Sequence, residues 1–195
     1  MILSTTALKK KNSPITPWHS YLIYQLKAQP TKAEKELLSL QATAPGMINI
    51  HYELALLLMQ SRQLQVAQRE LDKSEFFFPK SSKVAILRAR LALLQLKGVE
   101  SREVTPQESE HITKLIQTAI ERAPYSPYPL LLSAKQAFLQ GHMAKAHQEL
   151  QKALVLRPGL DEANSLLKAV IRKRMKQEGT HIQWQQQLEE LEKMN

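Results

Sequence analysis

The sequence predicts an all-α fold, a solenoid of about four helical hairpins followed by a capping helix and a final helix. Two observations carry this prediction. Four prolines close amphipathic segments at intervals of 34, 45 and 34 residues, and a period of 34 is typical of stacked helical hairpins. Small or apolar residues also recur five, eight and twelve places before each proline, which places one stripe on a helix. The prolines are Pro45, Pro79, Pro124 and Pro158, and the stripes are Leu40, Leu37 and Ala33; Ser74, Leu71 and Ala67; Ala119, Ile116 and Ile112; and Ala153, Leu150 and Ala146.

The helical periodicity runs through the whole array, from residue 14 to residue 160. We expect repeats at 14–47, 48–81, 82–126 and 127–160. The paired helices are predicted at 16–28 with 31–43, 47–60 with 63–77, 82–97 with 108–123, and 127–140 with 143–156. Pro30 and Gly141 are expected between the two helices of a hairpin, and no glycine falls inside a proposed helix.

Three segments lie outside the regular pattern. Residues 1–13 are predicted to be a basic, flexible leader. An insertion at 98–107 lengthens the third repeat, and it exceeds the usual connection between two helices. After the array, residues 161–178 begin with acidic residues and become basic, as suits a capping helix, and residues 179–195 are predicted to contain a final helix.

The spacing resembles that of the tetratricopeptide repeat family, whose signature ends in A-x3-F, a later small residue and a closing proline. Two repeats carry the resemblance best. The repeat at 48–81 offers Leu54, Ala55 and Leu58, then Ala67, Leu71, Ser74 and Pro79, and the repeat at 127–160 offers Leu130, Ala134 and Ala137, then Ala146, Leu150, Ala153 and Pro158. The first repeat matches loosely, with Trp18, Tyr21 and Tyr24. The resemblance implies a right-handed solenoid, and it implies no particular reaction because the family shares an architecture.

The chain of 195 residues has a formal net charge of +9, which favours acidic partners such as nucleic acid, anionic lipid or an acidic peptide. It has no cysteine, so disulfides and thiolate metal sites are excluded. Ile2 and Leu3 precede Lys9–Lys11, the reverse of the order in a secretory signal, and no apolar run approaches the ~20 residues that span a bilayer. We therefore expect a cytoplasmic protein without a transmembrane segment.

No motif in the chain suggests catalysis. There is no glycine-rich phosphate loop and no zinc-protease or serine-hydrolase motif. The closest two histidines, His142 and His147, are five residues apart, a spacing that turns their side chains away from each other on a helix. The sequence predicts no enzyme activity, no cofactor and no metal site.

In a helical-hairpin solenoid the first helix of each repeat lines the concave surface. Positions 2, 5, 9 and 12 of each repeat, chosen by analogy with tetratricopeptide proteins, give a candidate partner-binding groove that mixes apolar anchors with three cations. Its residues are Asn49, Tyr52, Leu56 and Met59; Lys83, Ile86, Arg90 and Leu93; and Tyr128, Leu131, Lys135 and Phe138. The alternative is that Leu56, Ile86 and Leu93 pack against neighbouring helices.

The leading hypothesis is a non-enzymatic protein–protein interaction module, an adaptor or assembly chaperone that binds an apolar and acidic peptide segment in this groove. One alternative is a nucleic-acid-binding helical repeat protein, based on the net charge and on a candidate basic patch at the end of the capping helix. The patch consists of Lys168, Arg172, Lys173, Arg174 and Lys176, although helical spacing spreads these residues around the helix. A further alternative is a secretion chaperone with tetratricopeptide repeats.

Overall fold

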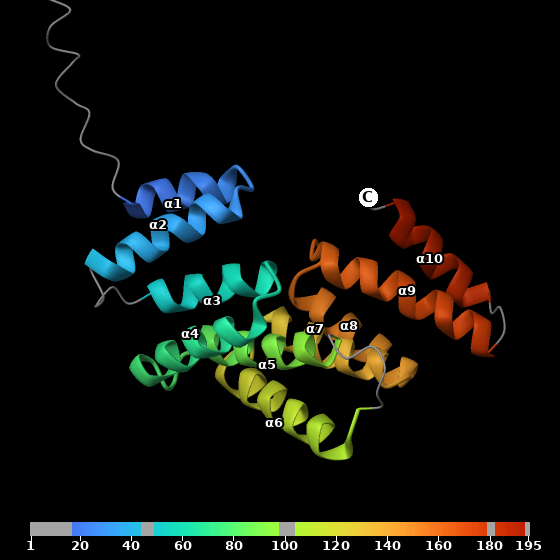
Figure 1. Cartoon of the computed structure of the whole chain (residues 1–195). Helices are drawn as coiled ribbons and strands as arrows, with labels where there is room; N and C mark the ends of the chain where they lie inside the picture. The colour runs from blue at the N-terminus through green and yellow to red at the C-terminus, as the bar shows by residue number, and fades with distance from the viewer. Residues whose placement is uncertain (1–16, 44–48, 98–103, 179–181, 194–195) are drawn as a thin grey trace, which may run out of the picture. The chain divides into compact units, whose positions relative to one another are not determined.

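The computed structural model describes residues 17–43, 49–97, 104–178 and 182–193, and all the regular secondary structure in these ranges is helical (Figure 1). The chain divides into two units, Met1–Phe77 and Phe78–Asn195. The predicted leader at 1–13 and most of the predicted insertion, residues 98–103, lie outside the described residues. The boundaries proposed for a single array at 14–160 stay a prediction.

Every predicted helix is present in the described residues, and its ends agree with the prediction to within three residues. The first unit contains α1 (Pro17–Leu26), α2 (Pro30–Thr43), α3 (Ile50–Gln60) and α4 (Leu64–Phe77). The second unit contains α5 (Ser82–Lys97), α6 (Pro106–Arg122), α7 (Pro127–Leu139), α8 (Met143–Leu156), α9 (Asp161–Glu178) and α10 (Ile182–Lys193).

The stripe that predicted the hairpins is the core of the protein. All twelve stripe residues are buried, including Ser74 and the alanines at 33, 67, 119, 146 and 153. Alanine at these places lets two helix backbones approach closely, because a longer side chain would hold them apart. The sequence pattern therefore identified the surfaces on which the helices pack.

In the first unit α1 packs on α2, α2 on α3, and α3 on α4. Tyr21 of α1 is buried, and its hydroxyl donates a hydrogen bond of 2.5 Å to Oε2 of Glu53 in α3. Burial raises the pKa of the Tyr21 hydroxyl, and the hydrogen bond and the negative charge of Glu53 raise it further. This contact joins the first helices of two successive hairpins.

The turn inside a hairpin repeats its backbone conformation along the chain. Ala28, Arg62 and Gly141 have φ values of 51°, 62° and 79°, and the N–H of the next residue in each case bonds to the carbonyl five residues back, at 2.9, 2.8 and 2.8 Å. This is the left-handed helix ending that glycine adopts most easily, and it costs about 1–2 kcal/mol for other residues. Ala28 and Arg62 thus occupy the same left-handed position in their turns as Gly141 does in its own turn.

Pro30 differs from its prediction in a small way. It is the first residue of α2 rather than part of the connection. A proline is well tolerated there, because its missing N–H would have no partner in the first turn and its φ is already helical. Pro106 and Pro127 occupy the equivalent first positions of α6 and α7.

The helix α6 begins two residues earlier than the sequence predicts. Thr105 caps it: the Thr105 hydroxyl accepts from the Glu108 N–H at 3.3 Å, and the Glu108 carboxylate accepts from the Thr105 N–H at 3.0 Å. This reciprocal pair is a capping box, and it fixes the start of the helix. The end of the predicted insertion, residues 106 and 107, therefore belongs to α6.

In the second unit α7 is the central helix, because it packs against α5, α6, α8 and α9. One core cluster joins α5, α6 and α7 through Ala89, Leu93, Ile112, Ile116 and Leu132. A larger cluster joins α7, α8, α9 and α10, and it includes Leu150, Leu167, Val170, Ile171 and Leu191. The predicted capping helix α9 thus covers the apolar side of the hairpin α7–α8, and α10 packs on α9.

Candidate peptide-binding face

The twelve predicted groove residues divide between the two units. Asn49, Tyr52, Leu56 and Met59 belong to the first unit. There Asn49 is exposed, Tyr52 and Leu56 are half-buried, and Met59 is buried in the core. Met59 is therefore not accessible to a partner in this conformation.

The eight residues of the second unit separate by helical position. At positions 2 and 9, Lys83 and Tyr128 are exposed, and Arg90 and Lys135 are half-buried. At positions 5 and 12, Ile86 and Phe138 are half-buried and pack against the core clusters. Leu93 and Leu131 are themselves core residues, with exposed fractions of 5% and 1%.

Helix geometry explains this division. The side chains at positions 2 and 9 point within about 20° of each other around the helix. The side chains at positions 5 and 12 point about 60–80° away from the side chain at position 2, toward the neighbouring helix. Leu93 and Leu131 are thus removed from the candidate site, as the packing alternative anticipated for Leu93. We call the surface formed by Lys83, Arg90, Tyr128 and Lys135 the α5–α7 face.

The α5–α7 face is basic. Lys83 and Arg90 have no acidic partner among the described residues. The Tyr128 hydroxyl accepts a hydrogen bond of 3.1 Å from Nη1 of Arg157, which follows α8. The face therefore presents two cations from α5 without an acidic partner in the described part of the chain, together with an exposed aromatic ring from α7.

Lys135 already has an acidic partner that the sequence did not predict. Its Nζ forms an ion pair with Oε1 of Glu162, in the first turn of α9. The side chains of Lys135 and Glu162 are 24% and 53% exposed. Glu162 is not one of the predicted groove residues, so α9 adds an acidic neighbour to Lys135.

The predicted basic patch on α9 does not form a single surface. Lys168 is buried. Arg172 donates to Glu192 of α10 at 2.9 Å, the Lys173 ammonium lies 5.1 Å from the Phe138 ring centroid, and Arg174 lies 4.3 Å from the Trp184 ring centroid. Lys176 is exposed. Three of the five cations are thus occupied by contacts within the second unit.

A polar cluster in the first unit was missed by the sequence analysis. Nδ1 of His51 in α3 lies 2.7 Å from Oε2 of Glu70 in α4, and Nζ of Lys73 lies 2.7 Å from Oε1 of the same carboxylate. Gln41 of α2 donates to Glu70 at 3.2 Å. Burial raises the pKa of Glu70, but the hydrogen bonds and charges of Lys73 and His51 together lower it below its usual value.

This cluster joins three helices, and no sequence motif indicates it because its members come from separate helices, α2, α3 and α4. The Phe77 ring stacks on the His51 ring, with centroids 6.0 Å apart. Phe76 is 82% exposed and meets Phe77 edge to face. The cluster is therefore a packing contact beneath an aromatic pair.

The described residues contain no group of three or more histidine, cysteine, aspartate or glutamate side chains placed to hold a metal ion. No helix in the described part of the chain is both long enough and apolar enough to cross a membrane.

Comparison with solved structures gives matches over almost the whole chain. A thermophilic TPR protein from Thermus thermophilus superposes with a TM-score of 0.70 at 15% sequence identity, covering 90% of this chain and 96% of that chain. The chain has the tetratricopeptide repeat fold. MamA from Desulfovibrio magneticus RS-1, from residue 41 to its end, superposes with a TM-score of 0.65 at 16% identity, covering 92% of this chain and 94% of that chain.

Another MamA structure superposes with a TM-score of 0.62 at 14% identity, over 89% of this chain and 95% of that chain. No family model matches the sequence, and no curated protein matches it. At these identities the likeness concerns the tetratricopeptide fold, so the function must be argued from this chain's own surface.

Proposed function

We propose that the chain is a protein-interaction module, an adaptor or assembly chaperone without catalytic activity, that binds an acidic and partly apolar peptide segment. The α5–α7 face is the centre of the proposed site. The single observation that carries the proposal is that Lys83 and Arg90 of α5 have no acidic partner among the described residues, while α7 carries the exposed ring of Tyr128.

The chemistry of the face suits an acidic peptide. Lys83 and Arg90 can donate charge-assisted hydrogen bonds to carboxylates, and the guanidinium of Arg90 can bind one in a bidentate manner. The Tyr128 ring supplies apolar area for a neighbouring side chain. A net charge of +9 also accelerates the encounter with an acidic partner.

Binding rather than catalysis is supported by the location of the titratable groups with shifted pKa values. Tyr21, Glu70 and His147 have shifted pKa values, and each is packed against neighbouring helices. The pKa of Glu110 is lowered by a surface pair with Lys114. Catalytic acids and bases instead gather at one cavity, where a substrate can reach them.

Asn49, Tyr52 and Leu56 of α3 are proposed to offer a contact surface of their own on the first unit. The chain is proposed to be cytoplasmic, and cell fractionation tests that location.

The test is a fluorescence anisotropy titration with a labelled peptide of glutamate and leucine residues. Replacing both Arg90 and Lys135 with glutamine removes two cations from the face, and we expect binding to weaken by about tenfold. The double variant Lys145→Gln, Lys176→Gln is the matched control, since it removes two exposed cations, on α8 and α9, that are not part of this face. Equal loss in the two double variants would show that only net charge matters, and would refute a specific site.

The nucleic-acid alternative makes a different prediction in the same assay. A labelled oligonucleotide should then bind more tightly than the acidic peptide, with an affinity that falls steeply as salt rises. The structure gives less support to this alternative, because Arg172, Lys173 and Arg174 contact residues of the second unit.

A further inference from the structure

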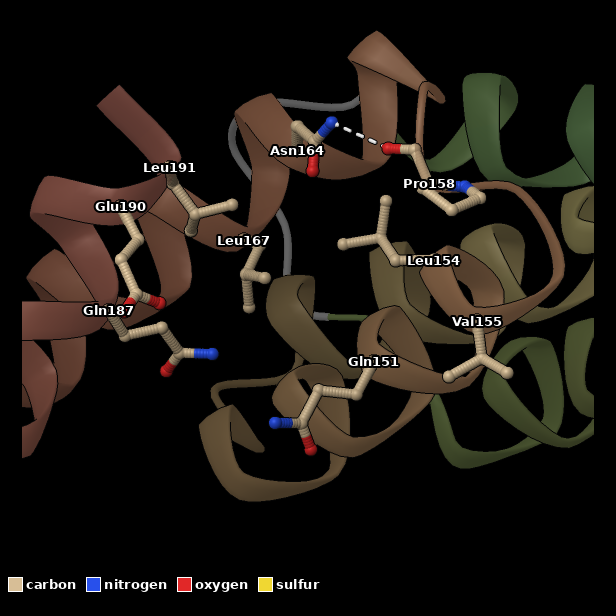
Figure 2. Close-up of a pocket in the computed structure, with 9 residues that line it drawn as sticks. All are labelled: Gln151, Leu154, Val155, Pro158, Asn164, Leu167, Gln187, Glu190 and Leu191. Carbon is tan, nitrogen blue, oxygen red and sulfur yellow. Dashed lines mark hydrogen bonds between the residues drawn. The ribbon is translucent and has the colours of Figure 1, made fainter. Parts of the chain in front are cut away.

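A second candidate binding site lies on the other side of α9, in the slot between α8, α9 and α10. The slot has a volume of about 580 Å³ and lies within the second unit (Figure 2). Its lining residues are Gln151, Leu154, Val155 and Pro158 from α8 and the turn after it, Asn164 and Leu167 from α9, and Gln187, Glu190 and Leu191 from α10.

The slot has an apolar floor. Leu167 and Leu191 are buried core residues, and Leu154 is half-buried. Val155 lies at the rim, because it is 82% exposed. An exposed valine beside leucines in a concave space can contact an incoming apolar side chain, and burying that valine on binding is favourable by the hydrophobic effect. The floor therefore fits one leucine-sized side chain of a partner.

The edge of the slot is polar and carries one charge. Glu190 is the only charged residue among those lining the slot, and it has no ion-pair partner among the described residues. Gln151 is exposed, and no described residue bonds to its amide. Gln187 is held by His147, whose Nε2 lies 3.1 Å from Oε1 of Gln187. The free carboxylate favours a cation next to the apolar side chain.

The slot and the α5–α7 face involve opposite sides of α9. Glu162, which pairs with Lys135, and Lys173 point within about 20° of each other on this helix. Asn164 and Leu167, which line the slot, point about 140–200° away from Glu162. A ligand in the slot therefore has no contact with the side of α9 that meets Lys135.

We propose that the slot between α8, α9 and α10 is a second docking site, which takes a partner peptide with a leucine-like side chain next to a lysine or arginine. The apolar side chain enters between Leu154, Leu167 and Leu191, and the cation pairs with Glu190. Gln151 hydrogen-bonds the peptide backbone. Because Glu190 is negatively charged, the segment proposed for the slot is basic, whereas the segment proposed for the α5–α7 face is acidic.

The test uses the full chain and three short labelled peptides: one with leucine and lysine residues, one with glutamate in place of each lysine, and one with serine in place of each leucine. We expect saturable binding of the first peptide and no binding of the serine peptide. The glutamate peptide should bind only at the α5–α7 face, so it should not displace the first peptide from the slot. Glu190→Lys should weaken binding of the first peptide by about fivefold and allow the glutamate peptide to compete with it. Val155→Lys should weaken binding of the first peptide as well, by placing a cation at the rim of the slot.

Glu189→Lys is the matched control, since Glu189 is an exposed neighbour of Glu190 on α10 that does not line the slot. Equal effects of Glu189→Lys and Glu190→Lys would overturn the proposal, and so would binding that is lost in the Arg90→Gln, Lys135→Gln variant. If the chain self-associates in analytical ultracentrifugation and Val155→Lys makes it monomeric, a second copy occupies the slot and the partner proposal is wrong. The outcomes that overturn the proposal are read from binding of the leucine and lysine peptide and from self-association, so failure here leaves the proposed function standing.

Discussion

Lys135 of the α5–α7 face forms an ion pair with Glu162 of α9, and this ion pair competes with a bound peptide. A peptide carboxylate that binds Lys135 must first displace the carboxylate of Glu162. Replacing Glu162 with glutamine removes this competitor and keeps a side chain of nearly the same size. We therefore expect Glu162→Gln to bind the acidic peptide more tightly than the unmodified chain does.

The structure bounds the size of this gain. Glu162 is half exposed, and ion pairs of this kind contribute about 0.2–1 kcal/mol. Removing the competitor should therefore tighten binding by about 1.4-fold to fivefold. Salt weakens the Lys135–Glu162 pair by screening, so the difference between the two proteins should shrink as ionic strength rises.

The assay is the same anisotropy titration, performed at low and at moderate salt. Glu110→Gln is the control, because Glu110 pairs with Lys114 on the surface of α6 at 2.8 Å and its loss changes the net charge equally. Unchanged or weaker binding in Glu162→Gln, with circular dichroism unchanged, would refute the assignment of Lys135 to the peptide site. An equal gain in Glu110→Gln would attribute the effect to net charge alone.

The remaining predictions concern stability, measured by urea unfolding followed by circular dichroism. Leu150→Ala should lower the free energy of unfolding by about 2.7–5 kcal/mol, because Leu150 is fully buried. Leu156 lies at the end of the same helix and is 42% exposed, so Leu156→Ala should cost less than about 1.5 kcal/mol. Similar losses in the two variants would contradict the packing of α8. Thr105→Ala should cost about 0.5–2 kcal/mol by removing the cap of α6, and no loss would mean that the capping box is not formed. Burial, and to a lesser extent the charge of Arg174, hold the pKa of His147 below 6.5 despite its hydrogen bond to Gln187. The unfolded chain therefore binds more protons than the folded chain. The free energy of unfolding should fall as the pH drops below about 6.5. In His147→Gln this part of the pH dependence should disappear, and an unchanged pH profile would exclude His147 as its source.

The helices and their packing surfaces could be predicted because each is encoded within a few neighbouring residues. A stripe at fixed offsets from a proline is local information, and it predicted all twelve buried stripe positions. The capping box of α6 is also visible in the sequence as the T-x-x-E spacing of Thr105 and Glu108, although the helix start was predicted two residues later. The turns at Ala28 and Arg62 were hidden, because no glycine marks their left-handed backbone.

The binding face was predicted less completely, since it depends on how separate helices meet. The burial of Leu93 and Leu131 follows from a turn of about 60–80° around the helix, which a closer reading of positions 5 and 12 would have shown. The Lys135–Glu162 pair depends instead on the register of α7 against α9. The polar cluster of His51 and Glu70 likewise requires α3 and α4 to be placed side by side. No spacing along the chain encodes these contacts.

The two proposed sites share α9 but use different sides of it. Glu162 pairs with Lys135 on one side, and Leu167 forms the floor of the slot on the other. Sites without shared partners generally contribute independently to binding. A basic segment in the slot should therefore leave the affinity of the α5–α7 face for an acidic segment unchanged. A module that holds two segments of opposite charge at once raises the effective concentration of one partner near the other, which is what an assembly chaperone or adaptor requires.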